Sequence, residues 1–88
     1  MEGEPTKEQL EQLNKWCGTE GINYYEGIEA LGFLFKYAVP KVDFWLASQE
    51  KSKRVGVQVQ YLGKLSGLIF GETLALALFW AIYQVKED

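Results

Sequence analysis

Leu65-Ser-Gly-Leu-Ile-Phe-Gly-Glu-Thr-Leu-Ala-Leu-Ala-Leu-Phe-Trp-Ala-Ile-Tyr83 is the stretch of sequence that decides the fold expected of this chain. It holds 19 residues and a single charged side chain, Glu72. The core of a bilayer is about 30 Å thick and needs about 20 apolar residues in a helix to cross it. The sequence therefore predicts a transmembrane helix over residues 62–84, followed by a polar tail over residues 85–88.

The residues that flank this stretch favour the same interpretation. Lys64 and Lys86 stand at its two ends, where long basic side chains reach toward lipid headgroups. Trp80 and Tyr83 lie where an interfacial belt of aromatic residues is expected. The alternative is a helix buried in a small globular domain, and a chain of 88 residues has little material to cover such a helix on all sides.

A short amphipathic helix is predicted near the N-terminus. Thr6 and Gln9 have the spacing of a capping box, in which a hydroxyl and a side-chain amide satisfy free backbone amides of the first turn. Gly18 is expected to end this helix. Residues 1–21 are therefore expected to form a short helix and a loop.

A second amphipathic helix is predicted over residues 22–48. Its charged residues fall within one arc of a helical wheel, and the opposite side is apolar. Pro40 removes an amide donor and should kink this helix. We expect the helix to lie in the membrane interface, with Trp45 as an aromatic anchor. The alternative is that its apolar side packs on the first helix in a small bundle.

Residues 49–61 are interpreted as a basic linker. Lys51, Lys53 and Arg54 form a basic cluster that would contact anionic headgroups or, equally, only set the topology in a solvated turn. Residues 55–61 alternate between apolar and polar, which is a strand signal. Because no partner strand is evident, an extended approach or an early helical turn is preferred, and the choice between them stays open.

The expected fold class is an all-α membrane protein with N-terminal amphipathic interfacial helices followed by one C-terminal transmembrane helix. Basic residues are more numerous before the span than after it, where only Lys86 stands. The positive-inside rule then places the N-terminus on the cytoplasmic, matrix or stromal side.

Composition excludes several classes of function. The net charge of −3 provides no basic field for nucleic acid. The chain has no histidine and one cysteine, Cys17, so it lacks the usual general base and the commonest metal ligands. It also offers no nucleophile–base pair and no phosphate-binding loop. We therefore expect no catalytic residues, no metal, no cofactor and no nucleic-acid partner.

Gly63, Gly67 and Gly71 stand four residues apart, and Ala75 continues the series. On a helix these positions share one face, where a second backbone can approach closely. The pattern predicts a helix-packing interface with a partner subunit or with a second copy. The alternative is the general tolerance of membrane helices for glycine.

Glu72 is the one charge inside the predicted span. An ionised carboxylate in hydrocarbon is costly, so this residue is expected to be protonated, paired or near a headgroup. A polar contact with a partner within the membrane is the preferred role. Proton carriage is the alternative, but the rotary-ring subunits that carry protons need two full spans.

Several short motifs resemble subunit g of the mitochondrial ATP synthase membrane sector. The resemblance covers about residues 32–83. It rests on Tyr37, Pro40 and Lys41, on Phe44 and Trp45, on Gly67, Leu68 and Glu72, and on Trp80.

The resemblance implies a non-catalytic accessory subunit in the inner mitochondrial membrane, with its N-terminus in the matrix. Such a subunit pairs through its glycine face with a subunit e-like helix and supports enzyme dimers and membrane curvature. The lipid bilayer, including an anionic lipid such as cardiolipin, would be a further partner. The alternatives are an accessory subunit of a respiratory or photosynthetic complex and a self-associating regulatory membrane peptide.

Overall fold

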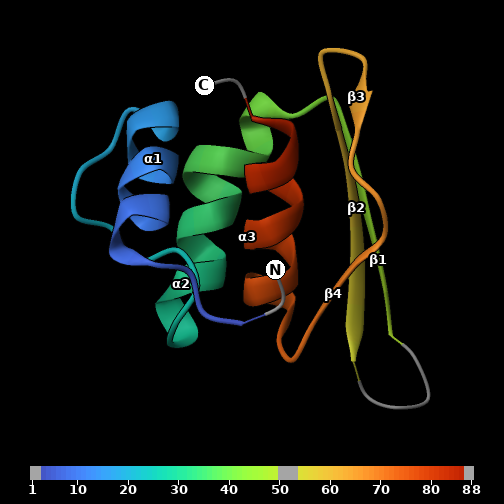
Figure 1. The fold of residues 1–88 in the computed structure, drawn as a ribbon, viewed down its shortest axis with the longest axis horizontal. Helices are drawn as coiled ribbons and strands as arrows, with labels where there is room; N and C mark the ends of the chain where they lie inside the picture. The colour runs from blue at the N-terminus through green and yellow to red at the C-terminus, as the bar shows by residue number, and fades with distance from the viewer. Residues whose placement is uncertain (1–2, 50–53, 87–88) are drawn as a thin grey trace.

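The computed structural model describes residues 3–49 and 54–86, which form an α+β fold with an antiparallel sheet (Figure 1). The predicted all-α membrane fold is therefore wrong. The helical elements are α1 (Lys7–Cys17), α2 (Ile28–Phe33), η1 (Leu34–Ala38), η2 (Val39–Lys41) and α3 (Leu74–Val85). The strands are β1 (Phe44–Gln49), β2 (Val55–Tyr61), β3 (Lys64–Leu65) and β4 (Ile69–Gly71).

The predicted transmembrane helix divides into two short strands and one short helix. Thr73 caps α3, because its hydroxyl accepts a hydrogen bond from the amide of Leu76 at 3.1 Å. The 12 residues of α3 extend for only about 18 Å at 1.5 Å per residue. Within residues 3–49 and 54–86, no helix has the length and apolar character needed to cross a bilayer.

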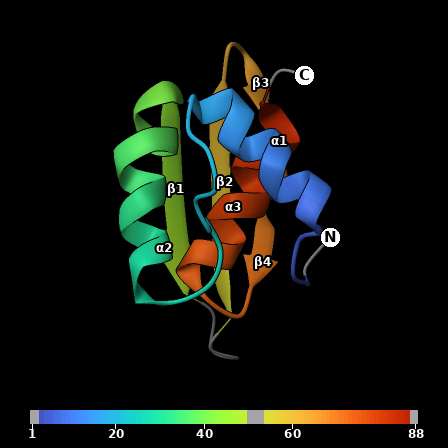
Figure 2. The same cartoon turned by 90° about the vertical axis from the view of Figure 1, so that its left-hand side faces the viewer.

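The apolar helix α3 is covered by protein on all sides, which corrects the argument against a buried helix. The sheet packs on one side of α3, where Val57 and Val59 of β2 are fully buried. Helices α1 and α2 lie on its other sides (Figures 1 and 2). The indole of Trp80 donates a hydrogen bond of 2.7 Å to the carbonyl of Gly3, and the hydroxyl of Tyr83 donates to Gln12 of α1. Nine of the twelve residues of α3 are buried as a result.

The central strand β2 explains the alternating pattern of residues 55–61. It pairs antiparallel with β1 on one side and with β3 and β4 on the other. The valines at alternate positions face α3, and Gln58 and Gln60 lie on the opposite face of the sheet. The strand signal was correct, and the partner strands are segments that the sequence analysis assigned to helices.

A tight turn connects β2 to the strands that follow. Leu62 and Gly63 have φ angles of 50° and 79°, which is the two-residue turn that suits a hairpin. A bulge then separates β3 from β4, because three residues of this segment lie opposite two residues of β2. At the bulge, the hydroxyl of Ser66 accepts a hydrogen bond of 2.9 Å from the buried amide of Val59.

Residues 22–48 do not form one kinked helix. Pro40 has no amide hydrogen, and the preceding turn widens so that the amide of Val39 donates to the carbonyl of Leu34. The helical segment ends at Lys41, and residues 44–49 continue as strand β1 along β2. Pairing with β2 outweighs the helical periodicity of this segment.

The N-terminal capping box is confirmed. The hydroxyl of Thr6 accepts from the amide of Gln9, and the side chain of Gln9 accepts from the amide of Thr6 at 2.8 Å. Gly18 ends α1 with a φ of 74°. The buried side chain of Asn14 then bonds the amide and the carbonyl of Ile22, which holds the following loop against α1.

Substitution of Gly71 should destabilise the fold. A Cβ atom at this position would lie 2.8 Å from the backbone nitrogen of Ala77, and α3 would have to move away from β4. We expect Gly71→Ala to lower the free energy of unfolding by about 1–3 kcal/mol, as overpacking does in other cores. Gly67→Ala is the matched control, since its Cβ meets open space and should change stability by less than about 0.5 kcal/mol. Equal denaturant midpoints for the two variants would contradict this packing.

Candidate interaction surface

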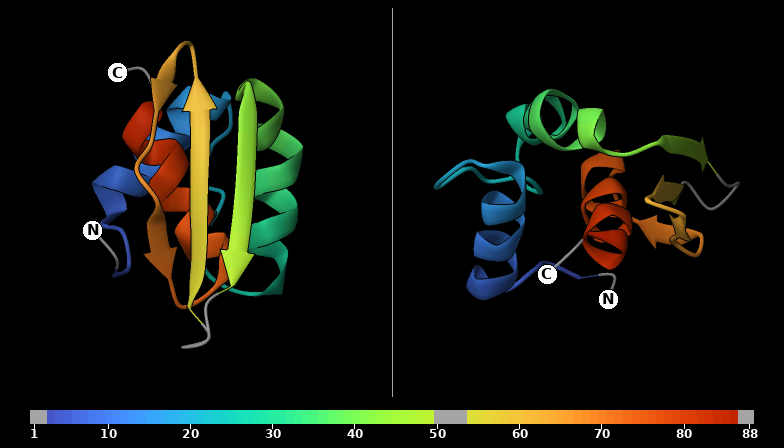
Figure 3. Two further views of the ribbon diagram at one scale, coloured as in Figure 1. Left: turned by 90° about the vertical axis from the view of Figure 1, so that its right-hand side faces the viewer. Right: turned by 90° about the horizontal axis from the view of Figure 1, so that it is seen from above.

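One face of the sheet is not covered by any described helix. Helices α1, α2 and α3 lie on the same side of the sheet, and the opposite side is open (Figures 1 and 3). We call this open side the outer face. Its exposed apolar side chains are Phe44 and Leu46 of β1, Leu65 of β3 and Leu68 of the bulge, which are 49%, 39%, 60% and 47% exposed.

Strand register places these side chains in rows across the outer face. Phe44 lies opposite Gln60, and Gln60 lies opposite Leu65. In the next row, Leu46 lies opposite Gln58. Apolar side chains of the two outer strands therefore flank a central pair of uncharged amides.

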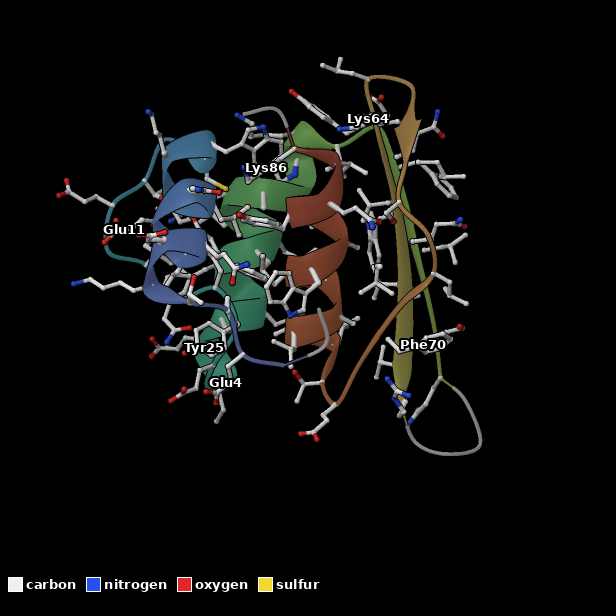
Figure 4. The ribbon with its side chains drawn as sticks, in the orientation of Figure 1. Glu4, Glu11, Tyr25, Lys64, Phe70 and Lys86 are labelled. Carbon is white, nitrogen blue, oxygen red and sulfur yellow. The ribbon has the colours of Figure 1, made fainter. Side chains whose placement is uncertain are left out.

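The β4 end of the outer face is formed by Phe70, which is labelled in Figure 4. Phe70 and Leu68 lie over Gly56, where an added Cβ atom would be 3.0 Å and 3.3 Å from their side chains. The guanidinium carbon of Arg54 lies 5.4 Å from the centre of the Phe70 ring. This end of the outer face is therefore apolar with a basic margin.

Exposed apolar side chains gathered on one face have a different meaning from scattered ones. A single exposed leucine is ordinary on a protein surface, whereas a contiguous apolar area with a polar margin is typical of an interaction site. Ile28 of α2 is 98% exposed but stands apart from the sheet, so it belongs to the ordinary kind. The outer face is the candidate interaction surface.

The predicted glycine interface is not assembled in the structure. Gly63 lies in the hairpin turn, Gly67 in the exposed bulge and Gly71 in β4, and Ala75 is a buried residue of α3. These four residues do not share a helix face. Gly71 does permit a close approach of two backbones, but between β4 and α3 of the same chain.

The residues predicted to meet the membrane are distributed over the fold. Glu72 is exposed between β4 and α3, and Trp45 packs edge-on against Phe35. Trp80 and Tyr83 face the N-terminal segment and α1. Arg54 precedes β2 and lies over Phe70. Lys51 and Lys53 lie outside the described residues.

A second cluster of side chains surrounds the buried residue Tyr24. Tyr24 is fully buried, and its hydroxyl lies 2.6 Å from that of Thr19. Burial raises the pKa of Tyr24 far above its ordinary value, although the hydrogen bond with Thr19 opposes this effect. Burial also raises the pKa of the Cys17 thiol, against the lowering effects of Tyr24 and Lys41. The thiol therefore stays protonated at neutral pH and is a poor nucleophile.

A shallow depression of about 580 Å³ lies between α1 and the loop that follows it. Its walls include the lysines Lys7 and Lys15, the glutamates Glu11 and Glu20, and Leu10. Charges of both signs line it, and the polar side chain of Asn14 beneath it is fully occupied by the loop. It lacks the convergent polar groups in an apolar pocket that mark a ligand site.

Sequence reasoning missed the outer face because it assigned both of its border strands to helices. The signal was present in the alternation of residues 55–61, which places Gly56, Gln58 and Gln60 on one side of β2. A comparison with known proteins finds no matching family model, no matching curated protein and no matching solved structure. The resemblance to subunit g therefore rests on its short motifs alone.

Alkaline pH should destabilise the protein partly through Tyr24. Because the pKa of Tyr24 is raised in the folded state, the unfolded chain releases this proton first as the pH rises above 10.0, the ordinary value for tyrosine. The stability that neutral Tyr24 provides is thus present below pH 10.0 and is lost as the pH rises further. We expect Tyr24→Phe to flatten the decline of the unfolding free energy above this pH, measured by urea unfolding at a series of pH values. Parallel declines in wild type and variant would contradict the assignment.

Proposed function

We propose that this chain is a non-catalytic interaction subunit that docks on a partner protein through the outer face of its sheet. The observation that carries the proposal is the set of exposed apolar side chains on both border strands, on either side of the central glutamines. Desolvation of such side chains provides about 25 cal/mol for each Å² buried. The two central glutamines can satisfy backbone or side-chain groups of the partner.

The partner surface that fits the outer face is apolar opposite the two border strands and offers hydrogen-bonding groups opposite the central glutamines. Leu46, Leu65 and Leu68 present exposed, uncharged apolar side chains to this partner. Arg54 stands at the β4 end, beside the ring of Phe70. Apolar side chains combined with uncharged hydrogen-bonding groups are common in protein interfaces.

A narrower proposal is that the partner belongs to the mitochondrial ATP synthase, with localisation at the inner mitochondrial membrane. It is supported by the motifs Tyr37, Pro40 and Lys41 and by Phe44 with Trp45. Docking of the outer face on a subunit of that complex would take the place of the glycine-face packing expected of a transmembrane helix, a helix that the described residues do not contain. A respiratory or photosynthetic complex is the alternative host, and co-migration on native gels separates the two.

Photo-cross-linking tests the docking surface directly. A photoreactive residue at position 65 should give a discrete adduct with one partner in cells, because Leu65 is the most exposed of the apolar residues assigned to the outer face. The same residue at position 28 is the matched control, since Ile28 is more exposed but lies on α2, away from the outer face. Adducts at position 28 without adducts at position 65 would refute the proposal.

Loss of the apolar side chains should also release the chain from its assembly. We expect the double variant Leu65→Gln, Leu68→Gln to move from the position of a large complex to that of the free chain on native gels. Ile28→Gln removes a more exposed apolar side chain elsewhere and should leave migration unchanged. A wild-type chain that migrates only as free protein would overturn the assignment.

A further inference from the structure

The outward edge of β1 has no strand partner among the described residues. β1 forms one border of the sheet and pairs only with β2 (Figure 3). Five of its six residues are exposed, and Trp45 is the half-buried exception. The row of backbone amides and carbonyls along this edge is therefore available for pairing.

The two borders of the sheet differ in their protection against pairing. The border formed by β3 and β4 is interrupted by the bulge at Gly67 and Leu68 and carries Lys64. Short strands, bulges and lysines are the devices by which natural sheets keep their edges unpaired. β1 is six residues long and contains no charge, no proline and no bulge. An edge without such devices is suited to strand addition.

We propose that β1 pairs antiparallel with β1 of a second copy of this chain, with Leu46 on the two-fold axis. A two-fold axis perpendicular to the sheet keeps the outer faces of both copies on the same side. In this register Leu46 lies opposite Leu46, Phe44 opposite Ser48 and Trp45 opposite Ala47. The result is one continuous sheet that runs through both copies.

The side chains of β1 are self-complementary in size in this register. Each aromatic residue meets a small residue of the other copy, which suits directly opposed positions about 4.5–5.5 Å apart. Ala47 lies on the inner face of the sheet, opposite Val57, yet is exposed. Trp45 is held in place by Phe35, with ring centres 5.1 Å apart, and would cover Ala47 of the second copy.

No like charges oppose each other in the same register. The pairing brings no like charges together, because β1 has no charged residue. Asp43, directly before the strand, lies opposite Gln49 of the second copy, whose side-chain amide can donate to the carboxylate. An axis at Trp45 would instead oppose the two indole rings and place Phe44 against Leu46, which crowds both faces.

This pairing is independent of the proposed docking function and adds to it. It uses the backbone edge of β1, whereas docking uses the outer face, and the dimer would present two outer faces side by side. Failure of one therefore leaves the other standing, since the mass of the purified chain tests pairing and cross-linking in cells tests docking.

Sedimentation of the purified chain tests the pairing. We expect a concentration-dependent species with twice the monomer mass of 10.1 kDa. Leu46→Lys would oppose two ammonium groups at the axis and should raise the dissociation constant by about tenfold or more. Gln60→Lys is the matched control, because it adds the same charge to the outer face on the central strand and should dimerise as wild type does. A wild-type chain that stays monomeric at all concentrations would overturn the proposal.

Disulfide trapping tests the register with a milder change. In a Cys17→Ser background, Leu46→Cys should oxidise with oxidised glutathione to a covalent dimer. Opposed residues of antiparallel strands have Cα atoms about 4.5–5.5 Å apart, within the range of a disulfide. Ala47→Cys faces Trp45 rather than itself in this register and should cross-link at least several-fold more slowly. Preferential cross-linking at position 47 would place the axis elsewhere and refute the register.

Discussion

The structure depends on covering α3, a helix that is apolar around its whole circumference. Such a helix has no side that tolerates water, so every direction must be filled by lipid or by protein. Here the sheet covers one side, and α1, α2 and the N-terminal segment cover the rest. The N-terminal residues are thereby tied to the C-terminal helix, as the hydrogen bond from Trp80 to Gly3 shows.

The helices pack around α3 on the inner side of the sheet, and no described helix covers the opposite side. α3 packs mainly on β2 and β4, and β1 at the border of the sheet is exposed except at Trp45. The outer face and the β1 edge are consequences of this single arrangement. A small domain that packs its helices around one buried helix leaves a sheet face open, and this open face is the one that we propose as its binding surface.

Glycine and serine have local roles that the linear pattern concealed. The spacing of Gly63, Gly67 and Gly71 is that of a helix-packing motif, but the first closes a hairpin with positive φ and the last lets β4 approach α3. Ser66 replaces a backbone acceptor at the bulge for the amide of Val59. Each of these small residues permits a particular backbone arrangement, and the neighbouring helices and strands determine which arrangement forms.

The sequence by itself determined the first helix and its cap, because Thr6, Gln9 and Gly18 act through contacts within one or two turns. It also determined the faces of β2, because alternation has a period of two wherever a strand forms. Only the tertiary structure decided that residues 44–49, 64–65 and 69–71 are strands, since pairing with β2 supplies their hydrogen bonds. The tertiary structure also decided that α3 is surrounded by protein. An apolar stretch is compatible with either lipid or a protein core, and only the elements packed around it distinguish the two environments.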